Sequence, residues 1–389
     1  MKKRVAVLGA TGSIGKSTLD ILRSKKEFFE PVLFSSHKNY EELVKLKREF
    51  PKAITALAGD EKSPQTADNS RQPEIDFYGK QALHDAIAAA EADITVNGIS
   101  GAAGLEPSLA VLESGSDLAL ANKETIVMAG SIVMALAREK KLSIIPVDSE
   151  HYAIFRLLEA HGRDRVSEII LTASGGPFRN YSMEQLKNVS AKDALAHPTW
   201  NMGPKITVDS ASMANKGLEI IEAAGLFGLA PEKIKVTVHP QSIVHSMVRL
   251  ADGSVYAQMS KPDMKLPICG ALNWPETECT AFGLLDFDSL HLDFEKPDFA
   301  KFPMLSLAYK ALSGGNCLSI AYNASNEIAV EAFFNGKTGF LEIPRIVEYV
   351  ITQDWPLTEG CMTIEAVLDI DRKAREIAEN YIHGGSMRC

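Results

Sequence analysis

Residues 5–22, VAVLGATGSIGKSTLDIL, decide the fold. The apolar run 5–8 predicts a buried β-strand, and the segment from 17 to 22 predicts a helix. Gly9, Gly12 and Gly15 lie in the turn between them, where glycine allows a tight bend and a close approach of backbone amides to a phosphate. The start of the helix adds a partial positive charge. This GxxGxxG turn therefore favours dinucleotide binding, although GxGxxG is the commoner spacing.

Two other interpretations of the turn stay open. Residues 10–17, ATGSIGKS, also satisfy a relaxed P-loop, in which Lys16 would reach the β- and γ-phosphates and Ser17 would hold magnesium. Gly9 and Gly12 would be redundant there, whereas a dinucleotide turn needs both, so the P-loop ranks second. A turn without a ligand is the third interpretation.

The sequence around this turn predicts an α/β domain. Further short apolar runs alternate with helical patterns, which is typical of a parallel sheet covered on both faces. In such sheets ligands bind beyond the carboxyl ends of the strands. The predicted strands are 31–34, 93–96, 117–120 and 143–147, and the predicted helices are 17–22, 40–50 and 80–90.

The end of the second strand favours NADP over NAD. NAD-binding folds usually offer an acidic residue to the ribose hydroxyls here, whereas NADP-binding folds offer a cation. Residues 35–39 read SSHKN, with Lys38 and no acid. The alternative is that Lys38 is only a solvated lysine before the next helix.

The rest of the chain predicts two further structural regions. Residues 150–275 read as α+β, with a strand at 206–208, a helix from about 211, and a hairpin whose turn is Asp252-Gly253. Helical periodicity dominates after 303. We predict a Rossmann-like doubly wound parallel sheet in 1–148, an α+β domain in 149–274, a linker in 275–302 and a helical bundle in 303–389.

Composition excludes several classes of protein. The 389 residues carry 41 Lys+Arg against 50 Asp+Glu, a formal charge of −9, which argues against wrapping nucleic acid. The most apolar stretch, 125–137, is shorter than the roughly 18 residues of a membrane span and reads as a buried helix. The N-terminus lacks a signal-peptide pattern. Five cysteines without CxxC spacing indicate neither a zinc site nor a disulfide scaffold. We expect a soluble cytoplasmic protein.

Asp148 and Glu150 lie at alternate positions where a predicted strand ends and a helix begins. Paired carboxylates at the carboxyl end of a strand suit a hard cation such as Mg²⁺ or Mn²⁺. Helix capping explains the same pattern equally well, because carboxylates are also favoured at a helix start.

Residues 208–219, VDSASMANKGLE, predict a polar helix face. A helix from about 211 would put Ser212, Asn215, Lys216 and Glu219 on one side. These side chains suit a phosphate and a third metal carboxylate; the alternative is a solvated face with a Lys216–Glu219 ion pair. Gly217 inside a helix costs roughly 1 kcal/mol relative to Ala, so we expect another group to approach closely there.

Three more segments suit a phosphate-handling site, although turn chemistry or a buried anchor would explain them too. Ser174 lies in a glycine-rich turn, and Lys123 follows a predicted strand and could stabilise developing negative charge. The loop 196–203, AHPTWNMG, exposes Trp200 and Met202 between proline and glycine, as a lid would.

Together these segments closely resemble the 1-deoxy-D-xylulose 5-phosphate reductoisomerase family. The resemblance covers essentially the whole chain and rests on GATGSIG at 9–15, ANKE at 121–124, PVDSEH at 146–151, TASGGPF at 172–178, HPTWNMG at 197–203 and ITVDSASMANKGLE at 206–219. It implies a metal-dependent NADPH enzyme that rearranges 1-deoxy-D-xylulose 5-phosphate and reduces the product to 2-C-methyl-D-erythritol 4-phosphate, for isoprenoid precursor synthesis. It also implies a homodimer, with strands in 235–259 as the candidate interface.

The resemblance assigns each kind of site residue. Contacts to NADPH are implied for Thr11, Gly12, Ser13, Ile14, His37, Lys38, Asn39, Asn122, Glu124 and Gly203. Ligands of a Mg²⁺ or Mn²⁺ ion are implied for Asp148, Glu150 and Glu219, which with Lys123 form the catalytic set. Substrate contacts are implied for Lys123, Ser149, Glu150, Ser174, His197, Ser210, Asn215, Lys216 and Glu219, and lid positions for Trp200 and Met202. The family often has Gly where His37 stands, and a partly protonated His37 would strengthen the NADP preference.

Overall fold

The computed structural model describes residues 2–59, 74–200, 202–277, 282–356 and 362–385. The chain forms two compact units. The first comprises Met1–Asn122, Val133–Tyr152 and Asp263–Phe282, and the second comprises Lys123–Ile132, Ala153–Pro262 and Gly283–Cys389. The domain boundaries given above stay predictions.

The first unit is built on a seven-stranded parallel sheet in the order β4-β3-β2-β1-β5-β6-β7, which confirms the predicted Rossmann-like fold. The chain moves outward from β1 to β4 and then returns to β5 on the other side of β1, so the strand order reverses between β1 and β5. Ligands bind at such a reversal. The strands are β1 (Lys3–Leu8), β2 (Phe29–Ser36), β3 (Ile54–Leu57), β4 (Phe77–Tyr78), β5 (Ile94–Asn97), β6 (Asp117–Leu120) and β7 (Ile144–Pro146).

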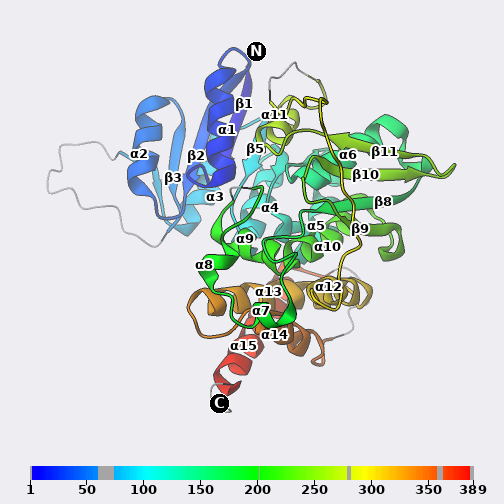
Figure 1. Cartoon of the computed structure of the whole chain (residues 1–389). Helices are drawn as coiled ribbons and strands as arrows, with labels where there is room; N and C mark the ends of the chain where they lie inside the picture. The colour runs from blue at the N-terminus through cyan, green and yellow to red at the C-terminus, as the bar shows by residue number, and fades with distance from the viewer. Residues whose placement is uncertain (1, 60–73, 201, 278–281, 357–361, 386–389) are drawn as a thin grey trace. The chain divides into compact units, whose positions relative to one another are not determined.

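Helices cover this sheet because each presents an apolar stripe to it. The first helix, α1, buries Leu19, Ile21 and Leu22, and Figure 1 shows α1 and α2 beside the first strands. A helix from much later in the chain, α11, packs on α1, β6 and β7, and Lys3 Nζ donates to the carbonyl oxygens of Leu272 and Trp274. The helices are α1 (Ser13–Ser24), α2 (Tyr40–Glu49), α3 (Lys80–Ala90), α4 (Leu105–Glu113) and α11 (Lys265–Asn273).

The second unit contains a four-stranded mixed sheet in the order β11-β10-β8-β9. β10 pairs antiparallel with β8 and β11, and the predicted hairpin turn at Asp252-Gly253 is confirmed, with Gly253 at φ +90°. The strands are β8 (Val166–Ala173), β9 (Ile234–Val238), β10 (Val244–Leu250) and β11 (Val255–Met259). Helices α5 (Lys123–Lys140) and α6 (Ser149–His161) each contribute residues to both units. The helix predicted at 125–137 is confirmed as part of α5, which is kinked at Ala129, but the predicted burial holds throughout only for 125–130, since Ser131 and Ala135 are exposed.

The strand predicted at 206–208 is wrong, because these residues lie inside helix α9 (Pro204–Ala211). The β-branched Ile-Thr-Val run favours a strand locally, but Pro204 at the first helical position starts a helix and packing buries Thr207 and Val208. Helix α10 (Ala214–Phe227) then begins after Met213, whose φ of +63° separates the two helices. The helix thus starts three residues later than expected, and Ser212 lies outside it.

The helical bundle predicted after residue 303 is confirmed, with α13 packed against three other helices. Figure 1 shows them in yellow to red. They are α12 (Met304–Ser313), α13 (Asn316–Phe334), α14 (Glu342–Ile351) and α15 (Ile364–Gly385). No helix within the described residues is both long and apolar enough to cross a bilayer. Cys279, Cys361 and Cys389 lie outside those residues, and neither Cys269 nor Cys317 forms a disulfide within them.

Gly217 is approached closely, as its position inside a helix led us to expect. A Cβ atom at Gly217 would overlap the hydroxyl of Tyr322 in α13 and lie 3.0 Å from the Cβ of Ala308 in α12. Tyr322 is fully buried, and its hydroxyl donates to the carbonyl oxygen of Met304 at 3.2 Å. The glycine therefore allows α10 to pack tightly on the bundle.

We expect Gly217→Ala to lower the free energy of unfolding by about 1–3 kcal/mol, because overpacking forces neighbouring groups apart. Urea unfolding measures the change. Gly339→Ala is the matched control, since a Cβ there meets open space. Adding Tyr322→Phe should recover part of the loss by removing the overlapping oxygen. If Gly217→Ala is as stable as the control, this account of the packing is wrong.

Candidate functional site

The glycine turn has the geometry that its spacing predicts. Gly9 has φ +73°, and a Cβ on it would lie 3.0 Å from the carbonyl oxygen of Gly98, beyond the end of β5. A Cβ on Gly15 would overlap the backbone of Ala10. Gly12 is the N-cap of α1, with no side-chain cap, and the first turn of α1 contains no acidic residue. The turn therefore brings the amide end of α1 to the point where the strand order reverses.

The end of β2 is tied to this turn by hydrogen bonds. Ser36 Oγ lies 3.1 Å from Thr11 Oγ1 and accepts a bond from the Asn39 amide at 3.2 Å, and the Ala10 amide donates to Ser35 O at 2.8 Å. Three exposed side chains follow, those of His37, Lys38 and Asn39. An exposed cation beside a helix N-terminus suits a 2′-phosphate better than it suits a free ribose.

Asn122 is locked at the end of β6. Its Nδ2 donates to the carbonyl oxygens of Ile99 and Gly101, each at 2.8 Å. A Cβ on Gly104 would lie 2.5 Å from the Asn122 side chain, so the loop after β5 fits closely around the amide. This contact fixes Asn122 at the carboxyl edge of the sheet, where its predicted cofactor role would place it.

Asp148 and Glu150 lie at the end of β7, as predicted. Asp148 Oδ1 accepts from the Glu150 amide at 3.2 Å, so Asp148 caps the start of α6. The same oxygen lies 3.4 Å from Nδ1 of His151, a fully buried residue that the sequence analysis did not single out. Ser149 Oγ donates to the Glu150 carboxylate. Capping is thus part of the role of Asp148. Because Glu219 belongs to the second unit, a site shared by all three carboxylates stays a prediction.

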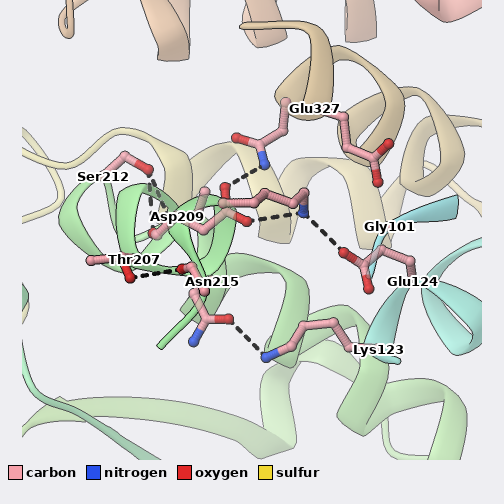
Figure 2. Close-up of polar contacts among 12 residues, drawn as sticks. Gly101, Lys123, Glu124, Thr207, Asp209, Ser212, Asn215 and Glu327 are labelled. Atoms are coloured by element: carbon pink, nitrogen blue, oxygen red, sulfur yellow. Dashed lines mark hydrogen bonds and ion pairs between the residues drawn. The ribbon is translucent and has the colours of Figure 1, made fainter. Parts of the chain in front are cut away.

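The predicted polar face of α10 is a buried charge cluster in the second unit. Lys123 Nζ donates to Asn215 Oδ1 at 2.7 Å, as Figure 2 shows, and to Glu219 Oε1 at 3.3 Å. Lys216 Nζ donates to the other oxygen of Glu219, and Asn215 Nδ2 to Oε1 at 2.6 Å. The side chains of Lys123, Lys216 and Glu219 are 6%, 4% and 0% exposed, so a solvated face is wrong although the ion pair is present. Two ammonium groups around one carboxylate leave this cluster attractive to an anion.

Ser212 does not share this face. It follows α9, and its hydroxyl donates to Asp209 O at 3.3 Å.

His197 joins two of the predicted substrate residues. Its Nε2 lies 3.0 Å from Ser174 Oγ and 3.1 Å from Ser210 Oγ. Its Nδ1 accepts from the amides of Thr199 and Trp200, so the neutral ring carries its proton on Nε2. Burial lowers the pKa of His197, which favours this neutral form. Three hydrogen-bonding groups from separate segments thus gather at one point, an arrangement suited to phosphate oxygens.

The candidate lid residues Trp200 and Met202 are both partly exposed, and Asn201 between them lies outside the described residues. The Trp200 ring centroid lies 6.1 Å from that of His245. Gly203 is the N-cap of α9, so the loop ends where that helix begins.

One cluster was missed by the sequence analysis. Lys205 and Asp209 lie one helical turn apart on α9 and contact Glu124 and Asn326, which lie far away in the sequence. The i, i+4 spacing of Lys205 and Asp209 was the available signal. Lys205 and Asp209 flank the segment 206–208, which was interpreted as a strand, and a strand does not bring residues four apart together.

Comparison with known proteins gives a consistent result along the chain. Residues 5–130 match the model of the 1-deoxy-D-xylulose 5-phosphate reductoisomerase family, 144–227 match its C-terminal domain, and 259–377 match a further DXP reductoisomerase C-terminal domain. The reductoisomerase of Treponema denticola is 47% identical over 378 residues, which is 97% of this chain and 96% of that protein. The reductoisomerase of Caldanaerobacter subterraneus is 44% identical, over 98% of this chain and 100% of that protein.

Solved structures agree with this result. The Zymomonas mobilis reductoisomerase in complex with NADPH has a TM-score of 0.89 and 40% identity, covering 98% of this chain and 99% of that one. A DOX-P reductoisomerase in complex with NADPH, fosmidomycin and magnesium has a TM-score of 0.90 and 38% identity, covering 98% of each chain.

Proposed function

Because this chain belongs to the 1-deoxy-D-xylulose 5-phosphate reductoisomerase family, we propose that it converts 1-deoxy-D-xylulose 5-phosphate to 2-C-methyl-D-erythritol 4-phosphate with NADPH and a divalent cation. The observation that carries this proposal is the likeness to reductoisomerases along 97% of the chain. The product would enter isoprenoid precursor synthesis. The P-loop interpretation has no support from these relatives.

The first unit suits NADPH. The uncapped start of α1 offers backbone amides to a pyrophosphate, and Lys38 offers positive charge to a 2′-phosphate beside the exposed His37. Solved relatives hold NADPH. We assign the dinucleotide to Thr11, Gly12, Ser13, Ile14, His37, Lys38, Asn39, Asn122, Glu124 and Gly203.

Asp148, Glu150 and Glu219 are the proposed ligands of the cation. Carboxylate oxygens are the donors that Mg²⁺ and Mn²⁺ prefer, and a solved relative holds magnesium. When bound, the cation would polarise the substrate's carbonyl and hydroxyl oxygens, and the nicotinamide would supply the hydride.

The chain's own residues would hold and orient the sugar phosphate. The hydroxyls of Ser174 and Ser210, the Nε2–H of His197 and the ammonium of Lys216 are donors suited to the phosphate, with Ser149 and Asn215 as further contacts. Binding energy from this remote group orients the carbons whose bond breaks and re-forms during the rearrangement. Lys123, held by Asn215 and Glu219, would stabilise negative charge on a substrate oxygen.

The loop carrying Trp200 and Met202 is the proposed lid. In a Trp274→Phe/Trp355→Phe variant, only Trp200 remains of the three tryptophans. We expect its emission to shift to shorter wavelength when fosmidomycin is added to protein already saturated with NADPH and magnesium, because lid closure removes water from the indole. NADPH without fosmidomycin is the control. An unchanged spectrum would contradict the lid role.

A homodimer and a cytoplasmic location are also proposed. In the second unit β11 is an edge strand, and Val255 and Tyr256 on it are 44% and 41% exposed. An exposed edge strand can pair with another chain, and a second copy of this chain would shield it. Size-exclusion chromatography with light scattering measures the mass, and a monomer at micromolar concentration would contradict the dimer.

A coupled assay tests the activity. NADPH absorbance is followed with 1-deoxy-D-xylulose 5-phosphate, with magnesium and with chelator, and other sugar phosphates serve as controls. We expect NADPH oxidation only with this substrate and the cation, and 2-C-methyl-D-erythritol 4-phosphate as the product by mass spectrometry and NMR. Oxidation that yields an unbranched sugar alcohol phosphate would contradict the rearrangement.

A further inference from the structure

The side chain of Lys205 bridges Glu124 and Asp209, which are far apart in the sequence. It lies in the first turn of α9, two residues after Gly203, and its Nζ lies 2.9 Å from Glu124 Oε1 and 3.0 Å from Asp209 Oδ2. Glu124 lies in the first turn of α5. The bridge therefore ties the start of α5 to the start of α9, within the second unit.

The partners of Lys205 are buried and held in place. The side chains of Glu124 and Asp209 are 7% and 2% exposed. The other oxygen of Asp209 accepts from Asn326 Nδ2 of α13 at 2.8 Å. Figure 2 shows Glu124, Asp209 and Glu327 turned toward a common centre. Glu327 Oε2 accepts from Arg375 Nη2 of α15 at 2.6 Å. Two helices of the bundle thus hold the acidic partners around one lysine.

The charge of Lys205 determines the ionisation of its buried acidic partners. Burial would lower the pKa of Lys205, but Asp209, Glu124 and Glu327 outweigh burial and raise it. Burial would also raise the pKa of Glu124, but Lys205 and then Lys123 outweigh it and lower that pKa. Glu124 is therefore a buried carboxylate kept ionised largely by Lys205. Without this ammonium, Glu124 and Asp209 would repel each other.

We propose that Lys205 is a positioning residue of the dinucleotide site, which it completes by holding the Glu124 carboxylate against the helix turn that carries Gly203. This inference rests on the proposed function, which assigns Glu124 and Gly203 to NADPH. The Gly203 carbonyl accepts from both the amide and the hydroxyl of Thr207, at 3.1 and 2.8 Å, so Gly203 is fixed to the same turn as Lys205. Lys205 sets the spacing of the two contacts before the cofactor binds.

A double-mutant cycle tests this role, with the Kd of NADPH for the metal-free full-length protein as the readout. Nicotinamide fluorescence is titrated for wild type, Lys205→Met, Glu124→Gln and the double variant. We expect Lys205→Met to raise the Kd about tenfold, which corresponds to a loss of about 1.4 kcal/mol of binding free energy. In the Glu124→Gln background the same change should raise it by less than about twofold, since no carboxylate remains to be held. Lys205→Arg should restore most of the affinity.

Controls separate positioning from stability. Lys187→Met removes a lysine from an exposed ion pair with Glu184 and should leave the Kd unchanged. The Tm of every variant is measured, and titrations are run well below the lowest Tm. An equal rise in Kd in both backgrounds, or no rise in Lys205→Met, overturns the role of Lys205. Absence of NADPH binding by the wild type would instead contradict the proposed function itself.

Discussion

Replacing Glu219 with Gln is expected to lower kcat on the order of 10³-fold, because polarisation of the substrate by the cation is worth several kcal/mol. Glu219 is fully buried and is the one proposed metal ligand in the second unit. The amide keeps the shape of the side chain but removes its charge. NADPH oxidation with 1-deoxy-D-xylulose 5-phosphate, measured over a range of Mn²⁺ concentrations, should show both the lower kcat and a weaker dependence on the ion.

The same substitution at an exposed site is the control. Glu184→Gln removes a carboxylate that pairs only at the surface with Lys187, and its kinetics should match the wild type. Circular dichroism and NADPH binding establish that Glu219→Gln is folded. A folded Glu219→Gln variant that is fully active in the presence of chelator would contradict the metal assignment.

Replacing Lys123 with Met is expected to lower kcat about 10²- to 10³-fold, the usual effect of removing one group that stabilises charge in the transition state. The side chain of Lys123 is 6% exposed and is oriented by Asn215 and Glu219. Because this interaction is proposed to strengthen in the transition state, kcat and kcat/KM for the sugar phosphate should fall together. Steady-state kinetics at saturating NADPH measures both.

Lys192→Met is the matched control, because Lys192 is an exposed lysine of the second unit. A loss confined to the KM for the sugar phosphate, with kcat unchanged, would show that Lys123 acts in binding alone. That result would contradict its catalytic role.

The sequence was sufficient to predict those parts of the structure that depend on a local residue pattern. The turn at Gly9 was predictable because glycine tolerates its positive φ and close contact. The sheet of the first unit was predictable because its strands are short apolar runs separated by helical patterns. The strand β3, Ile-Thr-Ala-Leu, was missed because four residues with a central Ala carry little strand signal.

Features that depend on tertiary contact were harder to predict. The Ile-Thr-Val run of α9 is helical because Pro204 starts a helix and burial outweighs β-propensity. The packing of α11 on α1 joins segments far apart in the chain, and local periodicity carries no information about it. The ion pair of Lys205 with Glu124 was hidden for the same reason, whereas its i, i+4 pair with Asp209 is a local signal. The assignment of polar residues to ligands came from the family resemblance, since spacing alone left capping and metal binding equal for Asp148.

The most direct test of the account is a crystal structure of the protein grown with Mn²⁺, NADPH and fosmidomycin, with anomalous diffraction recorded at the manganese edge. We predict a single strong peak with carboxylate oxygens of Asp148, Glu150 and Glu219 at coordination distance. Manganese bound elsewhere, or Glu219 out of reach of an ion held by the other two carboxylates, would contradict it.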